Sequence, residues 1–214
     1  MAQTHGMIDT ETLGTRTGSI ILSLGAIKFD PSGDNRLLCS DPKRVEDIHA
    51  SSDSFYRRIE LQSCKRIGMT ADPDTIKWWM QQAPTERFEA FDAQPRIDIA
   101  HVLTDFWLWW GNTSCPWSHG ASFDIPLVDE AYAKIGKRSP WKYTLVRDTR
   151  TLFDLAKFEW SDQKKFRAGP GHHHALFDAW NQVLMVQECF RRMQSNASNQ
   201  NPIVHVPAVV PATG

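Results

Sequence analysis

The stretch MIDTETLGTRTGSIILSLGAIKF, residues 7–29, predicts how the fold begins. Its first part, 7–14, is a short apolar approach to a polar turn, and 19–29 is rich in β-branched and aliphatic residues. The sequence DPSGDNR that follows at 30–36 is typical of a turn. We therefore predict a β-hairpin, or the start of a meander, whose first strand is short and is centred on 4–9.

Strand and helix patterns alternate along the rest of the chain. Asp72 and Pro73 predict a helix start, with an N-cap residue followed by proline at the first helical position, and Pro84 predicts the end of that helix. Residues 157–172 are polar and include KKFRAGPG, which predicts a mobile loop. The other predicted elements are a strand over 55–61, a helix over 97–110, a short strand and turn over 114–124, a helix over 123–136 ended by Gly136, a strand or extended loop over 143–148, a short helix over 149–157 and an amphipathic helix over 175–193.

The order of these elements predicts the fold class. Strands that come first, followed by alternating strands and helices, favour an α/β sheet with one antiparallel portion. At 214 residues the chain fits one domain of moderate size. We place that domain at 1–195 and predict a disordered tail at 196–214, where three prolines occur without a helical period.

Composition narrows the class of protein. Hydrophobic residues make up 41% of the chain and charged residues 23%, as is usual for a soluble globular protein. The first thirty residues show no signal-peptide pattern, and no window is apolar for the length of a membrane span, so we expect no membrane partner. The four cysteines form no CxxC pair, and we therefore expect a reduced, cytoplasmic protein. The formal net charge of −1 argues against the coating of long nucleic acids but fits an enzyme that holds a few nucleotides at one end.

Four acidic residues lie at the ends of predicted elements, beside small or apolar neighbours. Asp9 and Glu11 are two apart on the first strand, where alternation places both side chains on one face. Asp124 follows Phe123 at a strand-to-helix turn, and Asp178 lies one turn into the long helix. A D-x-E pair alone is expected about once by chance in a chain of this length. Four such carboxylates indicate divalent metal, because magnesium prefers oxygen ligands and a metal-free cluster would repel itself.

In this order, the acidic motifs resemble those of the DEDDh family of 3′–5′ exonucleases, which have a ribonuclease H-like fold. MIDTETLG (7–14) resembles the first motif, GASFDIPLVDEAY (120–132) the second, and HHALFDAW (173–180) the third, H-x4-D. The resemblance is greatest to the branch of phage exonuclease A and ribonuclease AS, which adds the stretches at 72–82 and 140–152. It covers roughly residues 7 to 190 and implies a mixed sheet flanked by helices in a single domain.

The resemblance also implies a reaction, in which two Mg²⁺ or Mn²⁺ ions hydrolyse the last phosphodiester bond of RNA or single-stranded DNA and release nucleoside 5′-monophosphates. The implied partner is a nucleic acid with a free 3′ end, the implied location is the cytoplasm of a bacterial cell or a phage-infected host, and a homodimer is compatible with the branch. The implied metal ligands are Asp9, Glu11, Asp124 and Asp178, the implied general base is His173, and the implied substrate-binding residues are Thr10, Leu13, Phe123 and Arg150.

The choice of His173 among three consecutive histidines depends on spacing and context. H-x4-D occurs twice, at 119/124 and at 173/178, but only the later pair leads into the long C-terminal helix. Positions five apart on a helix are about 140° out of register, so His173 is expected just before the helix, on the glycine-containing loop. We expect His172 and His174 to be bystanders.

Two departures from the family pattern motivate an alternative function. The family usually has asparagine five positions before the second aspartate, where this chain has His119. Pro116 would disturb a central strand, because proline removes a donor from the hydrogen-bond ladder. The alternative is a nucleic-acid 3′-end binding module that keeps the fold but cuts weakly or not at all.

Overall fold

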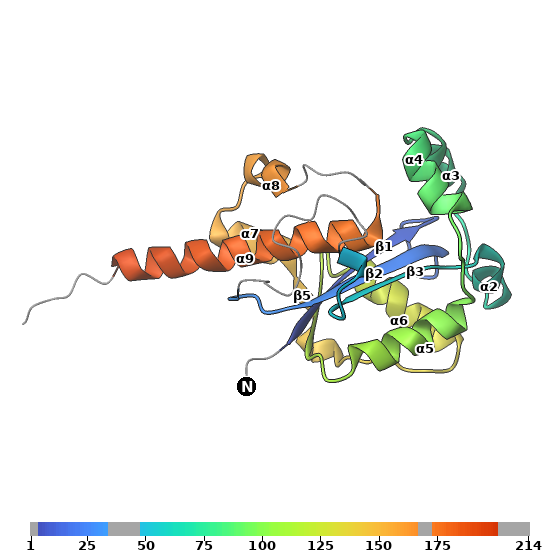
Figure 1. Cartoon of the computed structure of the whole chain (residues 1–214), viewed down its shortest axis with the longest axis horizontal. Coiled ribbons are helices and arrows are strands. Elements are labelled where there is room, and N and C mark those ends of the chain that lie inside the picture. The colour runs from blue at the N-terminus through green and yellow to red at the C-terminus, as the bar shows by residue number, and fades with distance from the viewer. Residues whose placement is uncertain (1–3, 34–47, 167–172, 201–214) are drawn as a thin grey trace, which may run out of the picture.

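A five-stranded mixed sheet forms the centre of the molecule, in the order β3-β2-β1-β4-β5 (Figure 1). The computed structural model describes residues 4–33, 48–166 and 173–200, with the side chains of 197–200 excepted. The first three strands form the predicted antiparallel meander, and the last two run parallel to β1. The strands are β1 (His5–Thr12), β2 (Ile21–Phe29), β3 (Ser54–Arg58), β4 (Cys115–Ser118) and β5 (Arg147–Asp148).

β1 is longer than its sequence predicts. It spans eight residues and pairs with β2 on one side and with β4 on the other. A Cβ atom at Gly6 would lie 2.4 Å from the ring of Trp110, so the glycine lets that buried ring pack against the strand. Pairing on both edges and this close packing outweigh the weak strand propensity of THGMID, and the prediction of a short first strand is wrong.

Pro116 lies in β4 without breaking the sheet. β5 pairs only with Trp117 and Ser118, so at Pro116 the strand has a ladder neighbour on the β1 side alone. A central strand therefore accommodates the proline because its second neighbour begins one residue later.

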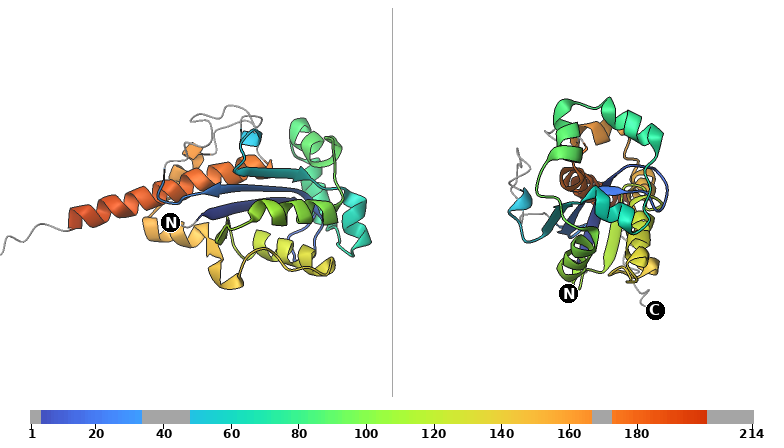
Figure 2. Two further views of the ribbon diagram at one scale, coloured as in Figure 1. Left: turned by 60° about the horizontal axis from the view of Figure 1, so that its bottom comes forward. Right: turned by 90° about the vertical axis from the view of Figure 1, so that its right-hand side faces the viewer.

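Helices cover both faces of the sheet (Figure 2). α5 and α6 pack with β1–β3 side chains around a core that includes Phe106, Trp110 and Tyr132. α7 and α9 pack on the opposite face around a second core that includes Phe153 and Trp180. The helical segments are α2 (Leu61–Arg66), α3 (Pro73–Met80), α4 (Pro84–Arg87), the π-helix η1 (Phe88–Asp92), α5 (Ile99–Trp110), α6 (Asp124–Lys134), the 3₁₀ turn η2 (Tyr143–Leu145), α7 (Thr149–Ala156), α8 (Trp160–Phe166) and α9 (Ala175–Gln200).

Gly25 sets how closely α9 approaches the sheet. It lies directly opposite Asp9 in the β1–β2 pairing. A Cβ atom at this position would lie 2.3 Å from the backbone of Ala175 and Leu176, a distance that real Cβ contacts do not reach. The missing side chain therefore allows the first turn of α9 to rest on β2, beside the strand that carries Asp9.

Three predicted boundaries differ from the structure. Residues 160–166 form α8 rather than a loop, because Asp162 accepts hydrogen bonds from Lys165 at 3.1 Å and from Arg192 of α9 at 2.9 Å. Pro84 begins α4 instead of ending α3, which stops at Met80. α9 continues past the predicted domain end at 195 to Gln200, and residues 167–172 and 201–214 lie outside the described residues. The division into domain and tail stays a prediction.

The other predicted elements are present, but the strand predicted over 55–61 ends at Arg58, and of the segment 143–148 only Arg147–Asp148 is a strand, after the 3₁₀ turn η2. Asp72 caps α3 by accepting a hydrogen bond from the Asp74 amide at 2.8 Å, with Pro73 in the first turn. Gly136 has a φ of 69°, as expected of a residue that follows a helix end. Among the described helices, none is both long and apolar enough to cross a membrane.

Candidate active site

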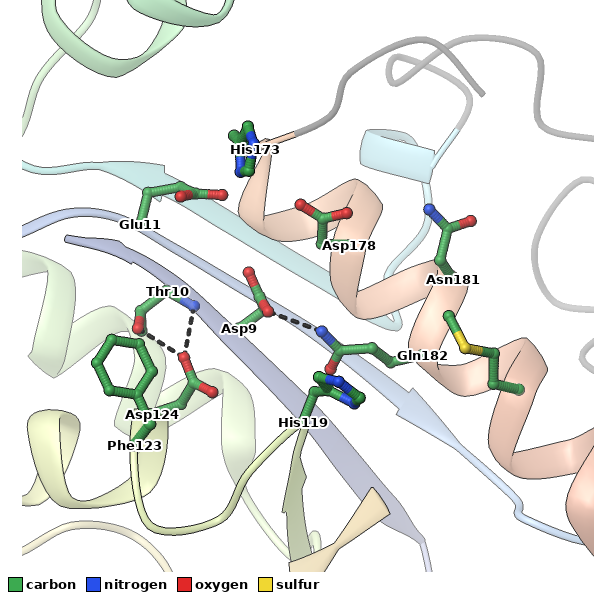
Figure 3. A pocket seen from close by; sticks show the side chains of 11 residues that line it. Asp9, Thr10, Glu11, His119, Phe123, Asp124, His173, Asp178, Asn181 and Gln182 are labelled. Atoms are coloured by element: carbon green, nitrogen blue, oxygen red, sulfur yellow. Dashed lines mark hydrogen bonds between the residues drawn. The ribbon is translucent and has the colours of Figure 1, made fainter. Parts of the chain in front are cut away.

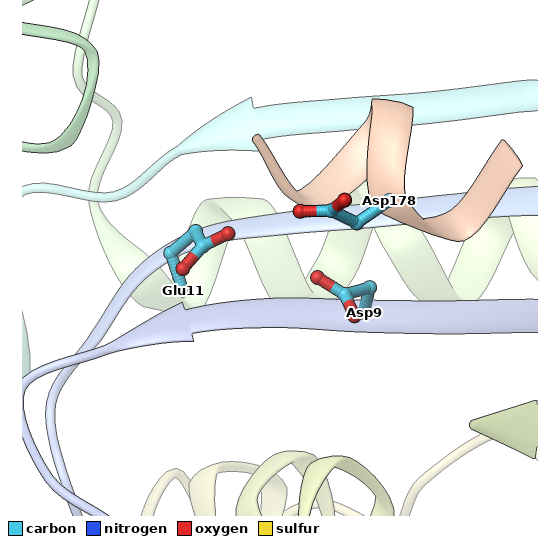
Figure 4. Close-up of side chains that lie close together, drawn as sticks. All are labelled: Asp9, Glu11 and Asp178. Carbon is cyan, nitrogen blue, oxygen red and sulfur yellow. The ribbon is translucent and has the colours of Figure 1, made fainter. Parts of the chain in front are cut away.

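Three predicted metal ligands converge at one end of the sheet. Asp9 and Glu11 project from the same face of β1, and Asp178 projects toward them from the first turns of α9 (Figure 4). One carboxylate oxygen from each residue lies within 4.8 Å of the others. This spacing allows all three to bind one cation, as alternation along β1 predicts.

Asp124 belongs to the same cavity but faces a different neighbour. It is the first residue of α6, and its Oδ1 accepts hydrogen bonds from the Thr10 amide at 3.1 Å and the Thr10 hydroxyl at 2.7 Å (Figure 3). It lines a cavity of about 230 Å³ together with Asp9, Glu11 and Asp178. Thr10 thus fixes the fourth carboxylate beside the other three.

Burial and mutual repulsion oppose ionisation of these carboxylates. Burial, followed by the charges of Asp124 and Asp178, raises the pKa of Asp9 well above its usual range. The same causes raise the pKa of Glu11, and burial raises that of Asp124 to about 7 although Thr10 donates to it. Divalent cations would remove this repulsion, so the donor set fits a metal site.

The Asp124 shift predicts that stability without metal falls as the pH rises. With a pKa near 7 in the folded protein and near 3.8 in the unfolded chain, the folded state binds more protons between these values. The free energy of unfolding in EDTA should therefore decrease from pH 5 to pH 7.5, and less so in Asp124→Asn, whose Oδ1 still accepts from Thr10. Thermal unfolding of both proteins at the two pH values measures the difference. An equal pH dependence in both proteins would contradict the prediction.

His173 occupies the position predicted for the general base. It lies two residues before the start of α9, has a left-handed φ of 59°, and lines the carboxylate cavity. Its ring makes edge contacts with Trp78 at a centroid distance of 4.9 Å and with Trp79 at 5.9 Å. A left-handed conformation is costly for a residue with a side chain and persists only where its surroundings impose it. The indoles of α3 therefore help to hold the imidazole over the carboxylates.

His174 is buried, and the structure gives it a packing role that the sequence does not predict. Its ring stacks on Tyr56 at 4.2 Å, and its Nε2 lies 3.8 Å from Glu89 of the π-helix. Glu89 also accepts hydrogen bonds from Tyr56 and from Arg58. Burial lowers the pKa of His174 to about 4, so the ring is neutral at pH 7. His174 therefore anchors the start of α9 next to His173, while His172 lies outside the described residues.

His119 lines the carboxylate cavity as well (Figure 3). Its Nδ1 lies 2.8 Å from the Thr149 hydroxyl, and the neighbouring Ala121 amide donates to Asp148 at 2.6 Å. The end of β5 thus holds the loop that carries His119. The histidine that replaces the usual asparagine is consequently part of the site, on the opposite side of the carboxylates from His173.

Sequence reasoning missed the continuation of the site along α9. Gln182 donates to Asp9 Oδ1 at 2.7 Å, which orients one of the carboxylates that could hold a metal ion. Asn181 and Met185 line the same cavity. These residues follow Asp178 at intervals of three, four and seven, so helical spacing alone marks them as neighbours on one face.

A second cavity adjoins the carboxylates on the side of α3. It has a volume of about 440 Å³ and shares Glu11 with the first cavity. Trp78 and Trp79 form an aromatic wall, and the Trp79 indole donates to the Thr12 carbonyl at 2.9 Å. The other lining residues are Thr10, Thr12, Thr15, Asp72, Asp74, Thr75 and Phe123.

The four predicted substrate-binding residues lie in different surroundings. Thr10 and Phe123 line both cavities. Leu13 is only 3% exposed and packs in the core, and within the described residues it lines neither cavity. Arg150 is exposed on α7 and, within the described residues, lines neither cavity. Its guanidinium lies against Gly120, next to His119, and its positive charge acts to lower the pKa of Asp124.

Among the solved structures that share this fold are two nucleases. Cell-death related nuclease 4 superposes with a TM-score of 0.55 at 13% identity over 88% of this chain, which spans only 64% of that protein. The nuclease domain of 3′hExo, a DEDDh family member solved with rAMP, gives a TM-score of 0.52 at 11% identity over 89% of this chain and 92% of that one. The fold is therefore that of ribonuclease H-like nucleases, and within it acidic residues from β1, α6 and α9 meet beside a histidine.

The family follows from the sequence as a whole. Residues 4–190 match the family model of the 3′–5′ exoribonuclease Rv2179c-like domain, and the chain belongs to this family of exonucleases. No curated protein sequence matches the chain. The family description confirms the predicted DEDDh exonuclease, whereas the kinship to phage exonuclease A stays a prediction.

Proposed function

We propose that this protein removes nucleotides one at a time from the 3′ end of single-stranded nucleic acid, and that RNA is the preferred substrate. The observation that carries the proposal is the meeting of Asp9, Glu11 and Asp178 within 4.8 Å in a cavity that also contains Asp124 and His173. The family description, which names an exoribonuclease, supports RNA.

The four carboxylates would hold two Mg²⁺ or Mn²⁺ ions. Their raised pKa values and their oxygen-only donor set fit hard divalent cations. When bound, such ions supply an activated water and stabilise the charge on the attacking and leaving oxygens of an in-line displacement. Gln182 keeps Asp9 oriented through the hydrogen bond to Oδ1.

The remaining residues of the site have separate proposed roles. His173 accepts the proton of the attacking water, since a neutral imidazole can do so near pH 7. The cavity beside α3 receives the 3′-terminal nucleotide, with Trp78 and Phe123 available for stacking on the base. Arg150 contacts a phosphate at the rim. The product is a nucleoside 5′-monophosphate.

The test compares matched RNA and DNA oligonucleotides that carry either a free or a phosphate-blocked 3′ end. With Mg²⁺, we expect mass spectrometry to show nucleoside 5′-monophosphates from free ends, faster from RNA, and little product from blocked ends. The alternative function, a 3′-end binding module without cleavage, predicts tight binding of free 3′ ends with no mononucleotide in either Mg²⁺ or Mn²⁺. Internal cleavage products would exclude both functions.

A further inference from the structure

A run of positive charge connects α6 to β5, away from the carboxylate cavities. The segment KIGKRSPWKYTLVR, residues 134–147, contains five lysines and arginines and no acidic residue, although the whole chain carries a net charge of −1. Lys134 is paired with Glu130 at 3.4 Å. Lys137, Arg138 and Lys142 are exposed, and among the described residues neither Arg138 nor Lys142 takes part in an ion pair.

Aromatic and apolar side chains are exposed beside these cations. Tyr143 is 85% exposed, and Trp107 and Leu108 of α5 are 52% and 67% exposed. Two cavities share Lys137 and Arg138, one of about 620 Å³ that extends to Tyr143 and one of about 350 Å³ that extends to Trp107. Neither shares a lining residue with the cavities at the carboxylates. We call Trp107, Lys137, Arg138, Lys142 and Tyr143 the basic surface.

We propose that the basic surface binds the upstream part of a single-stranded nucleic acid. Regularly spaced phosphates complement its exposed cations, and exposed aromatic rings provide stacking platforms that accept any base. An acidic protein partner would satisfy the cations but not the exposed rings, and an apolar partner would leave the cations unpaired. The combination of both residue types favours a single strand.

The basic surface could help the cleavage of long substrates, an inference that rests on the proposed function. Lys137 and Arg138 follow the C-terminal end of α6, and the length of this 11-residue helix, about 16 Å, separates them from Asp124 at its first residue. On the other side, η2 and β5 lead from the surface to Arg150. A strand held here by its upstream phosphates keeps its 3′ end near the carboxylates between cleavage steps. Long substrates therefore gain affinity from the basic surface, whereas a dinucleotide does not.

The experiment uses a triple variant, Arg138→Ala, Lys142→Ala and Tyr143→Ala, in the full chain. All three side chains are exposed, so folding should be unaffected. In EDTA, we expect the dissociation constant of a fluorescein-labelled 20-nucleotide RNA to rise about tenfold or more, from the loss of one stacking contact and two cations. The slope of log K against log salt should become shallower by roughly 1.4 for the two lost phosphate contacts.

With Mg²⁺, KM for the 20-mer should rise while kcat and the hydrolysis of a dinucleotide stay unchanged.

A matched control removes the same residue types from the opposite face of the sheet. Lys157, just after α7, with Trp160 and Lys164 of α8 supply one aromatic ring and two cations and leave the Asp162–Lys165 pair intact, and their triple alanine variant should bind the 20-mer as the native protein does. Unchanged 20-mer binding in the α6–β5 variant, or an equal loss in the control variant, would overturn the proposal. Equal losses for dinucleotide and 20-mer would also overturn it. Binding in EDTA does not require cleavage, so this arm decides the question even if the proposed function fails. An unlabelled 20-mer with a blocked 3′ end, added as a separate strand, shows whether the basic surface binds a second strand instead of the upstream part of the substrate itself.

Discussion

Asp178→Ala is expected to reduce the turnover of 3′-end cleavage about a thousandfold or more. Asp178 supplies the α9 oxygen of the three-carboxylate group, and its loss leaves that group with only the two carboxylates of β1. Metal ions contribute several kcal/mol of transition-state stabilisation, and each 1.36 kcal/mol corresponds to a factor of ten in rate. Release of labelled mononucleotide in Mg²⁺ measures the effect.

Stability measurements separate this loss from simple unfolding. Removal of one carboxylate relieves repulsion, because the charge of Asp178 raises the pKa of both Asp9 and Glu11. In EDTA at pH 7.5 the variant should therefore unfold at the same temperature as the native protein or at a higher one. Asp105→Asn, on the exposed side of α5, is the matched control and should cleave normally. Native activity in Asp178→Ala would exclude the proposed metal site.

His173→Ala is expected to reduce kcat by about 10²- to 10⁴-fold, the usual contribution of general acid–base catalysis. The carboxylates remain in place, so Mn²⁺ binding followed by calorimetry should be unchanged. The rate of the variant should also recover in part when imidazole is added. These readouts distinguish a lost base from a lost metal.

Two other histidines provide the controls. His101→Ala, on the exposed side of α5, should have native kinetics and stability. His174→Ala should lower the unfolding temperature, because it removes the ring that stacks on Tyr56 beside Glu89. A His173→Ala protein with native kcat would show that another group accepts the proton, and His119, which lines the same cavity, would be the next residue to replace.

The sequence predicts the sheet and the four carboxylates because both depend on local patterns. Alternation places Asp9 and Glu11 on one face, and an N-cap followed by proline marks the start of α3 at Asp72. The order of the motifs then identifies which distant aspartates join them. These features need no knowledge of how the helices pack.

The features that the sequence does not reveal depend on tertiary contacts. β1 is long because two neighbours pair with it, and α8 forms where Asp162 meets Arg192 of α9. In the sequence His174 is one of three consecutive histidines, and its packing role is visible only from its tertiary contacts with Tyr56 and Glu89. Gln182, by contrast, could have been found from its spacing to Asp178.

The close packing of α9 against Gly25 has a consequence for the synthesis of the protein on the ribosome. Asp9, Glu11 and Asp124 have all been synthesised well before the chain reaches α9, but Asp178 arrives only with that helix. Chains are made from the N-terminus at about 5–20 residues per second, so a nascent chain spends seconds with three carboxylates and no partner helix. Under the proposed function, the nascent chain therefore cannot cut nucleic acid until α9 has been synthesised. The four-carboxylate cavity is completed only when α9 comes to rest on Gly25, a residue that has no side chain.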